Sequence, residues 1–401
     1  MHTTDPISSS RTALWAFRLL CLGAFGVTFS IAAGQIFCGL AVITWGIGLL
    51  RRELRVQLSA IAVITTIYAV LAIVSAALGT NPERGLDKAD SLFWLLLLLV
   101  TSSLVRTPRR FRQLLGAVLA GTCVLALQVI VLNPIQARAN MAAGLEWAHS
   151  FEAALIDVGG MTDGQMLMVG IVLCCGFLAL PQQTRKQRLR FVLMLVLLCV
   201  GLEMNFKRGS WICTLAVGGL FILRMDRRLI LVALIALPLA ACVPLVRERA
   251  VQIQDEFDVS GGGRITMWFE VTPRMLEEHP WGIGFASMTE EKMQSYSDTV
   301  ERHRNHLHSN IAQILATMGW LGLAVYTLWM GCGVRDAARR LRAVPPAWRD
   351  SHPLALAVLL ALVGLILNGL IEYNIGDSEV LILYAILLGI PVALRVPVAE
   401  A

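Results

Sequence analysis

The chain has 401 residues, of which 56% are hydrophobic and 15% are charged, and its mean hydropathy is +0.67. A water-soluble protein could not bury so much apolar surface, so the composition excludes soluble classes and indicates a polytopic membrane protein. The net charge of +6 is dispersed among short loops, so it does not indicate a nucleic-acid-binding protein.

The chain contains a series of apolar segments of the length that crosses roughly 30 Å of hydrocarbon. Because an open sheet edge is not tolerated in lipid, long apolar runs predict transmembrane helices. The sequence therefore predicts an all-α fold with about 12 transmembrane helices. The predicted spans are 13–31, 34–50, 56–78, 91–105, 113–132, 163–180, 190–205, 210–223, 229–246, 307–331, 353–372 and 379–395.

Basic residues gather in alternate connections between these spans, and these connections carry 19 of the 34 Lys and Arg residues. By the positive-inside rule the basic connections face the cytoplasm, so we expect both termini there. The polar N-terminus has no short apolar region followed by a small-residue cleavage site, so we expect no cleaved signal peptide. The basic connections are 51–55, 106–112, 185–190, 224–228 and 335–349.

The connection between the ninth and tenth predicted spans, residues 247–305, is long and faces outward. Long connections are uncommon in compact proteins and are often functional. We expect one transmembrane domain, 1–401, with this segment inserted as a helical cap. Within the cap, 264–280 is amphipathic and predicts a helix on the membrane surface, with Ile265, Trp268, Phe269 and Leu276 on roughly one face.

Two outward segments carry cations against the positive-inside trend. Lys207 and Arg208 open the span that begins near 210, where they either meet lipid headgroups or bind an anion with the help of Gly209. Arg264 follows three glycines, and such a run is either a hinge or a backbone cradle for an anion. The residue types alone leave both alternatives open.

The stretch "ERHRNHLHSN" (301–310) holds His303, His306 and His308 beside Arg304. Flanking arginines repel a cation, and histidines two residues apart do not share a helix face, so we expect no metal site. His308 is placed differently, because it precedes an apolar run whose helix N-terminus disfavours imidazolium. A neutral imidazole is what a general base needs; the alternative is a histidine that caps the helix or meets headgroups.

In "HSNIAQILATMGWLG", His308 is followed by Ser309, nine residues, Gly319, two residues and Gly322. An Arg-Gly pair at the head of a span ("KRGSW") and a Gly-Arg pair before an aromatic-rich helix and "HPWGIGF" (279–285) accompany this pattern. Together with the twelve-span layout, the combination resembles the bacterial O-antigen ligases of the O-antigen ligase/polymerase family over nearly the whole chain.

The resemblance implies a glycosyltransferase in the inner membrane of a Gram-negative bacterium, with its active site facing the periplasm. The implied donor is O-polysaccharide on undecaprenyl diphosphate, and the implied acceptor is a sugar hydroxyl of lipid A-core. The reaction would invert the anomeric centre without a metal or nucleotide cofactor. His308 would act as general base, and Arg208 and Arg264, helped by Lys207, would stabilise the diphosphate leaving group.

Other polar residues remain candidates without an assigned role. Glu372, Asn374 and Asp377, between the last two spans, could orient His308 or a sugar, and no spacing argument selects among them. His303, Arg304, His306 and Arg138 are candidates for lining the cleft, and Arg84 and Arg138 could also contact an anionic lipid.

Two other functions remain open at this level. An O-antigen polymerase would join repeat units on the same lipid carrier. A transporter of polysaccharide or lipid is less favoured, because transporters place ionisable residues near the membrane midplane, whereas the polar groups here collect at one face.

Overall fold

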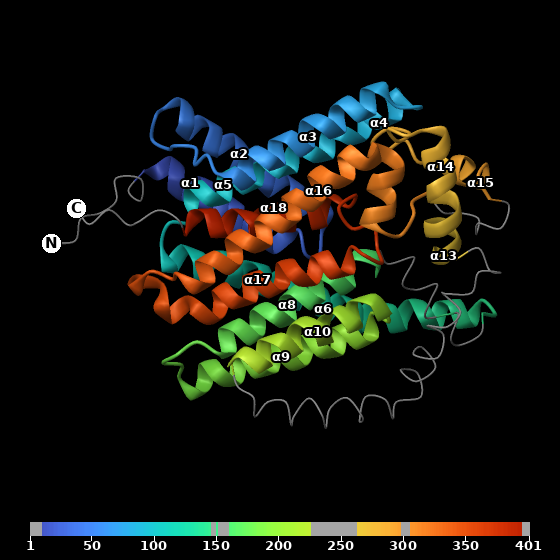
Figure 1. Cartoon of the computed structure of the whole chain (residues 1–401). Helices are drawn as coiled ribbons and strands as arrows, with labels where there is room; N and C mark the ends of the chain where they lie inside the picture. The colour runs from blue at the N-terminus through green and yellow to red at the C-terminus, as the bar shows by residue number, and fades with distance from the viewer. Residues whose placement is uncertain (1–9, 146–149, 151–159, 226–262, 298–304, 395–401) are drawn as a thin grey trace.

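The computed structural model describes residues 10–145, 150, 160–225, 263–297 and 305–394. Within these residues the fold is all-helical, without a β-strand, and most of the long helices run side by side in a bundle (Figure 1). The elements are α1 (Arg11–Gly26), α2 (Ile31–Leu50), α3 (Ala60–Leu78), α4 (Pro82–Lys88), η1 (Ala89–Leu96), α5 (Leu97–Leu104), α6 (Pro108–Ala142), α8 (Gly160–Leu178), α9 (Arg185–Met204), α10 (Arg208–Met225), α13 (Arg264–Thr266), η4 (Met267–Val271), α14 (Thr272–Glu278), α15 (Glu290–Gln294), α16 (Asn310–Arg342), η5 (Pro346–Ser351), α17 (His352–Asn368) and α18 (Ser378–Ala393).

Serine and threonine side chains set the starts of several helices. Thr107 Oγ1 accepts a hydrogen bond from the backbone N–H of Arg110 at 3.2 Å, and this bond caps α6. Before α9, Thr184 and Gln187 form a capping box. Such caps satisfy N–H groups that a helix leaves unpaired, so the apolar runs begin at defined residues.

The described helices coincide with the predicted spans, while the predicted span 229–246 lies outside the described residues. The segment predicted at 91–105 divides into a 3-10 helix, η1, and the α-helix α5. Two helices continue well past their predicted ends: α6, which contains Pro134, from 132 to Ala142, and α16 from 331 to Arg342. The last turns of α6 contain Ala, Gln, Arg and Met, which favour helix, while the polar Asn, Gln and Arg side chains end the apolar span.

Several helices have the length and composition to cross a membrane. Five described segments meet this condition: Ile31–Leu50, Ala60–Leu78, Pro108–Ala142, Asn310–Arg342 and Trp348–Asn368. Large apolar side chains also point outward, such as Ile36 on α2 (60% exposed) and Leu193 on α9 (61% exposed). Such surfaces suit contact with acyl chains rather than water. The chain is a polytopic membrane protein, as its composition predicts; the number of twelve spans stays a prediction.

Helix α18 lies at the centre of the bundle. Every residue from Glu379 to Ala393 is buried, and the helix packs against α2, α5, α16 and α17. A helix that is apolar on all sides can be enclosed by other helices without leaving a polar side chain unpaired among them. Its first turn, at Ser378 and Glu379, therefore brings polar side chains to a fixed place at one end of the bundle.

Residues 263–297 form a small helical layer at one end of the bundle (Figure 1, yellow). Elements α13, η4 and α14 follow one another as one helical run with a π-helical turn at Met267–Val271. The segment 264–278 is helical, as expected, and Met267, Val271 and Met275 form the face that it buries in the protein. Its position on a membrane surface stays a prediction. Phe269 is 73% exposed. The methionines form a second hydrophobic cluster with Leu307, separate from the main core.

A glycine divides α16 into two parts. Gly319 has φ 63° and ψ −168°, outside the helical range, so the helix bends there. The segment 279–285 lies along the bend, where the backbone N–H groups of Ile283 and Gly284 donate to the carbonyls of Ala316 (3.0 Å) and Thr317 (2.8 Å). These bonds pair carbonyls that the broken helix leaves without a helical partner. The two glycine-containing motifs of the sequence therefore contact each other directly.

Candidate active site

The loop before α16 holds His308 in an unusual backbone conformation. Ser309 caps the helix by accepting a hydrogen bond from the N–H of Ala312 (3.4 Å), so His308 lies one residue before the cap and not in the helix. His308 has φ 47°, in the left-handed region, and its side chain is buried, with 2% exposed. A bulky residue in this region is strained, and such strain gathers at functional sites.

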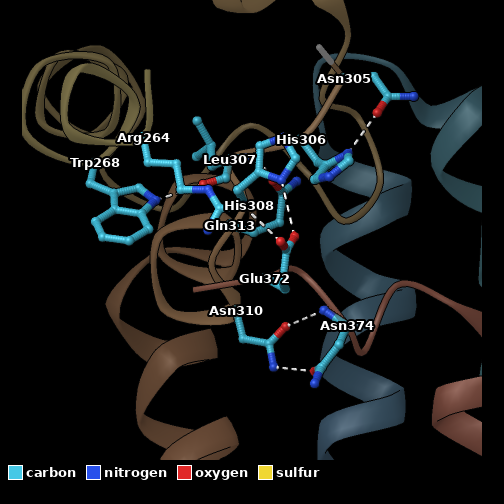
Figure 2. Close-up of polar contacts among 10 residues, drawn as sticks. All are labelled: Arg264, Trp268, Asn305, His306, Leu307, His308, Asn310, Gln313, Glu372 and Asn374. Atoms are coloured by element: carbon cyan, nitrogen blue, oxygen red, sulfur yellow. Dashed lines mark hydrogen bonds and ion pairs between the residues drawn. The ribbon is translucent and has the colours of Figure 1, made fainter. Parts of the chain in front are cut away.

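The Glu372 carboxylate, in the turn between α17 and α18, contacts two of the predicted site residues. Its Oε1 lies 2.7 Å from Nη2 of Arg264, and its Oε2 lies 3.1 Å from Nδ1 of His308 (Figure 2). Three segments distant in the chain meet here: the start of α13, the loop before α16 and the α17–α18 turn. Among Glu372, Asn374 and Asp377, it is Glu372 that contacts His308.

The charges around Glu372 keep its carboxyl group ionised. Burial alone would raise the pKa of Glu372, but the hydrogen bond with His308 and the positive charges of Arg264 and Lys207 lower it to about 2. An ionised carboxylate accepts a hydrogen bond from the N–H at Nδ1, and this tautomer leaves the Nε2 lone pair of His308 to accept a proton. The pair thus has the geometry of a histidine base oriented by a carboxylate.

A buried amide network holds the two sides of this pair together. Asn310 lies two residues after His308 and Asn374 two residues after Glu372, and their side chains bond each other at 2.7 Å. Asn374 also donates to Oε1 of Gln165 on α8 at 2.7 Å, and Asn310 donates to the hydroxyl of Tyr326 at 3.0 Å. The network fixes the loop before α16 against the α17–α18 turn.

The predicted cations lie at the same end of the bundle. The charge of Lys207 contributes to the lowered pKa of Glu372, so this residue belongs to the electrostatic site. Arg208 is the first residue of α10, and its neighbour Gly209 lies against Ile371: a Cβ added at Gly209 would lie 2.7 Å from Cδ1 of Ile371. Arg264 is in direct contact with Glu372.

A cavity of about 940 Å³ lies beside Glu372. Glu372, His306 and Asp377 line it; His308 is not among the described lining residues, but its ring centroid is 4.2 Å from that of His306. Burial, with the negative charges of Glu379 and Glu372, raises the pKa of Asp377 to about 8. Asp377 is therefore largely protonated at neutral pH and can donate a hydrogen bond into the cavity.

The remaining predicted cleft residues have different outcomes. His306 lines the cavity, and its role in a substrate cleft stays a prediction. Arg138 is exposed on α6 and is not among the described residues that line the cavity. His303 and Arg304 lie outside the described residues.

One group of side chains could hold a metal ion. One ligand atom from each of His306, His308 and Glu372 lies within 4.8 Å of the others. Two imidazoles and a carboxylate are a donor set that zinc accepts. However, Glu372 already pairs with Arg264 at 2.7 Å, and this guanidinium charge opposes a cation at the same oxygen pair. The contact with Arg264 thus favours an anionic ligand over a metal.

Two groups of residues at this site were not singled out by the sequence. Asn310 lies two residues after His308, and an asparagine at this position does not by itself indicate a structural role. Its contact with Asn374 shows its role in the packing. Lys88 lines the cavity together with Arg84, which the sequence pointed to only as a lipid contact. Their spacing of four residues, which places both side chains on one face of a short helix, was the feature of the sequence that could have indicated a shared role.

Part of the chain matches a known protein family. Residues 192–327 match the family described as O-Antigen ligase. The matched region contains Lys207, Arg208, Arg264 and His308, while Glu372 lies beyond its end. No curated protein matches the chain. Over residues 192–327, the chain is therefore similar to the O-antigen ligase/polymerase family, which supports its membership of that family.

Proposed function

We propose that the chain is an O-antigen ligase. In this proposal it transfers O-polysaccharide from undecaprenyl diphosphate to a sugar hydroxyl of lipid A-core. The observation that carries the proposal is the Glu372 carboxylate, which contacts His308 with one oxygen and Arg264 with the other. A candidate base and a candidate anion-binding cation are thereby joined through one residue, as transfer from a diphosphate requires.

The proposed base is His308. A sugar hydroxyl is a weak nucleophile, so its proton must leave as its oxygen attacks the anomeric carbon. Nε2 of His308 accepts that proton, while Glu372 accepts a hydrogen bond from Nδ1 at 3.1 Å and stabilises the imidazolium that forms. The new bond joins the acceptor oxygen to the anomeric carbon, and attack from the side opposite the leaving group inverts that carbon.

The proposed leaving-group site consists of Arg264, Arg208 and Lys207. The bond between the anomeric carbon and the diphosphate oxygen breaks, and the undecaprenyl diphosphate leaves with the electron pair. Its negative charge grows in the transition state, where guanidinium groups stabilise it through charge-assisted hydrogen bonds. These cations do the work that a divalent ion does in other transferases, so the proposal includes no metal or nucleotide cofactor.

The proposed location is the inner membrane of a Gram-negative bacterium. The carrier lies in the bilayer between helices, and the site faces the periplasm. This orientation is supported by the basic connections, such as 335–349, which the positive-inside rule assigns to the cytoplasm. In the proposal both termini are cytoplasmic, and residues 247–305 form the periplasmic insertion in a single domain, 1–401.

Replacement of His308 by Ala tests the proposal in cells. We expect lipid A-core without polymer, together with accumulation of polymer on the carrier, both visible when lipopolysaccharide and carrier-linked glycan are separated by gel. His352→Ala, an exposed histidine at the start of α17, is the matched control and should behave as the wild type. Normal amounts of attached polymer in His308→Ala would overturn the assignment of the base.

Deletion of the gene distinguishes the ligase from the polymerase. Loss of a ligase leaves bare core, because no polymer is attached. Loss of a polymerase leaves core that carries a single repeat unit, because ligation continues. Single-repeat lipopolysaccharide in the deletion strain would therefore contradict the ligase and identify the polymerase.

A further inference from the structure

The cavity beside Glu372 extends well beyond the residues that the proposed chemistry uses. Its volume of about 940 Å³ is lined by side chains from α2, α4, η1 and α8 as well as from the α17–α18 turn. Gln35, Gln165 and Ser378 are among those that carry neutral hydrogen-bonding groups. Gln35 donates from Nε2 to Oγ of Ser378 at 2.9 Å, which joins two walls. Convergent amide and hydroxyl groups suit a ligand rich in hydroxyls.

Aromatic side chains complete the lining. Trp94, Tyr373 and Phe285 face the same cavity as the amide and hydroxyl groups. Aromatic rings present flat apolar surfaces against which the C–H faces of a sugar ring can pack, while amides bond its hydroxyls. The combination identifies a saccharide as the class of ligand that fits this volume.

One wall of the cavity is positively charged. Arg84 and Lys88 are four residues apart on α4, so they share one face of the helix, and both line the cavity. Like charges at this spacing repel each other, and a bound anion relieves the repulsion. Nε of Arg84 donates to the carbonyl of Ala286 at 3.2 Å, which holds the guanidinium at the cavity wall.

The carboxylates near α4 leave this wall positive. Lys88 lies 3.7 Å from Asp87, but both side chains are more than half exposed (63% and 74%), so this ion pair is weak. Glu83 and Asp87 of α4 are not among the described residues that line the cavity, so Asp90 is the carboxylate of this wall and offsets one of its two cations. The other carboxylates that line the cavity belong to the α17–α18 turn and the start of α18: Glu372, Asp377 and Glu379. The remaining positive charge suits a single anionic group on the ligand.

This wall is distinct from the cations assigned to the leaving group. Arg264 and Lys207 are not among the described residues that line the cavity. In the view of Figure 2, Arg264 and His306 lie on opposite sides of His308, and His306 is the one that lines the cavity. An inverting displacement requires the nucleophile and the leaving group on opposite sides of the anomeric carbon. A ligand in the cavity reaches the His308–Glu372 pair through His306 and Glu372, which both line it, whereas the leaving-group cations are not among its described lining residues.

We propose that this cavity binds the acceptor saccharide, and that Arg84 and Lys88 bind an anionic substituent, phosphate or carboxylate, on its sugars. The proposal rests on the proposed transferase function and names the chemistry of its acceptor. Bound in this way, the acceptor approaches the His308–Glu372 pair from the His306 side.

Binding of a soluble acceptor probe tests the proposal without any transfer reaction. The full chain is placed in nanodiscs of phosphatidylcholine, and the affinity for core oligosaccharide freed of lipid A is measured in its native and dephosphorylated forms. A carboxyl-reduced form separates phosphate from carboxylate recognition. The variant Arg84→Gln/Lys88→Gln is compared with Arg335→Gln/Arg339→Gln, an exposed pair with the same spacing at the other end of α16.

We expect the α4 variant to bind the native oligosaccharide roughly tenfold more weakly, because charge-assisted bonds are lost. The form that lacks the recognised anion should bind the wild type and the variant equally. Equal affinity of wild type and variant for the native form would overturn the proposal. So would an equal loss for every form in a variant that keeps the melting temperature of the wild type, because Arg84 and Lys88 would then not recognise the anion. When the measurement is repeated with an anionic lipid added to the nanodisc, a loss that appears only there would assign the cations to headgroups and also overturn the proposal.

The two proposals fail in distinguishable ways. If His308→Ala leaves transfer intact but the α4 variant loses the native oligosaccharide, the acceptor site stands without the proposed base. If transfer depends on His308 while binding is indifferent to Arg84 and Lys88, the transferase function stands without this acceptor site.

Discussion

Asn310 and Asn374 form a reciprocal pair directly beside the pair of His308 and Glu372. Nδ2 of Asn310 donates to Oδ1 of Asn374 at 2.7 Å, and the backbone N–H of Asn374 donates to Oδ1 of Asn310 at 3.0 Å. Each asparagine follows its site residue by two positions. The asparagine contact and the His308–Glu372 contact therefore join the same two segments, the loop before α16 and the α17–α18 turn. A shift of either segment breaks both contacts at once, which couples the position of the proposed base to that of its carboxylate.

Asn374→Ala tests whether the hydrogen bonds between Asn310 and Asn374 position the base. The change removes the partner of Asn310 and of Gln165 at a fully buried site, which costs about 1–3 kcal/mol of stability. We also expect kcat to fall by about 10²-fold, because a displacement near 1 Å has effects of that size, while KM for the acceptor stays near that of the wild type.

A second variant separates positioning from stability. Tyr326→Phe also removes the hydrogen bond between residue 326 and Asn310, but it leaves the hydrogen bonds between Asn310 and Asn374 intact. It should lower the melting temperature and keep most of kcat. Equal losses of kcat in Tyr326→Phe and Asn374→Ala would show that Asn374 acts only through general stability.

Glu372→Gln tests the carboxylate that joins Arg264 and His308. The amide is similar in shape but carries no charge, so it neither pairs strongly with Arg264 nor stabilises an imidazolium at His308. We expect transfer to fall roughly 10²–10⁴-fold, the range associated with general acid–base groups. The measurement is the initial rate of polymer transfer with purified protein.

The matched control is Glu277→Gln, an exposed carboxylate on α14. It should retain the wild-type rate. Glu372→Asp keeps the charge on a shorter side chain and should recover part of the activity. A wild-type rate in Glu372→Gln would remove this residue from the proposed mechanism.

The helices could be predicted from the sequence because lipid imposes a simple condition on the chain. An apolar run of about 20 residues in a bilayer has to pair its backbone groups within a helix, so its position is visible in hydropathy alone. Features that depend on polar helical residues or on backbone geometry are not visible in this way. The continuation of α6 to Ala142 and the bend of α16 at Gly319 are of this second kind.

The candidate site was predictable only in part for a related reason. Arg264 and His308 belong to recognisable local motifs, whereas Glu372 was one of three polar residues in a turn without a distinguishing spacing. Its selection depends on how the α17–α18 turn packs against the loop before α16. That packing is set by the buried amides Asn310 and Asn374, whose contact joins segments far apart in the chain.

The raised pKa of Asp377 predicts a pH dependence of stability. Burial, with the charges of Glu379 and Glu372, raises this pKa from 3.8 to about 8. Between these values the folded protein binds a proton that the unfolded chain releases, so stability falls as the pH rises through this range. We expect the melting temperature to decline towards pH 8, and Asp377→Asn, which stays neutral, to flatten the decline.

The comparison is made on melting curves of wild type and Asp377→Asn in one detergent across pH 5 to 9. Asp350→Asn, at an exposed carboxylate in η5, serves as the control and should follow the wild type. An unchanged slope in Asp377→Asn would mean that other groups set the pH dependence.

Gly319 in α16 is predicted to be required for the fold of the site. Its φ of 63° with ψ of −168° lies in a region essentially restricted to glycine, and a Cβ there would lie 2.8 Å from the backbone carbonyl carbon of Trp281. Gly319→Ala should therefore lose about 1–3 kcal/mol of stability from backbone strain, with a further loss from the displaced 279–285 segment.

Gly331→Ala is the control on the same helix: no atom lies within 4 Å of its added Cβ, so it should be neutral or slightly stabilising. Thermal unfolding of both variants measures the difference, and equal melting temperatures would contradict the role of the bend. Because the bend presents Ala316 and Thr317 to the segment 279–285, Gly319→Ala should also reduce transfer, even in protein that remains folded.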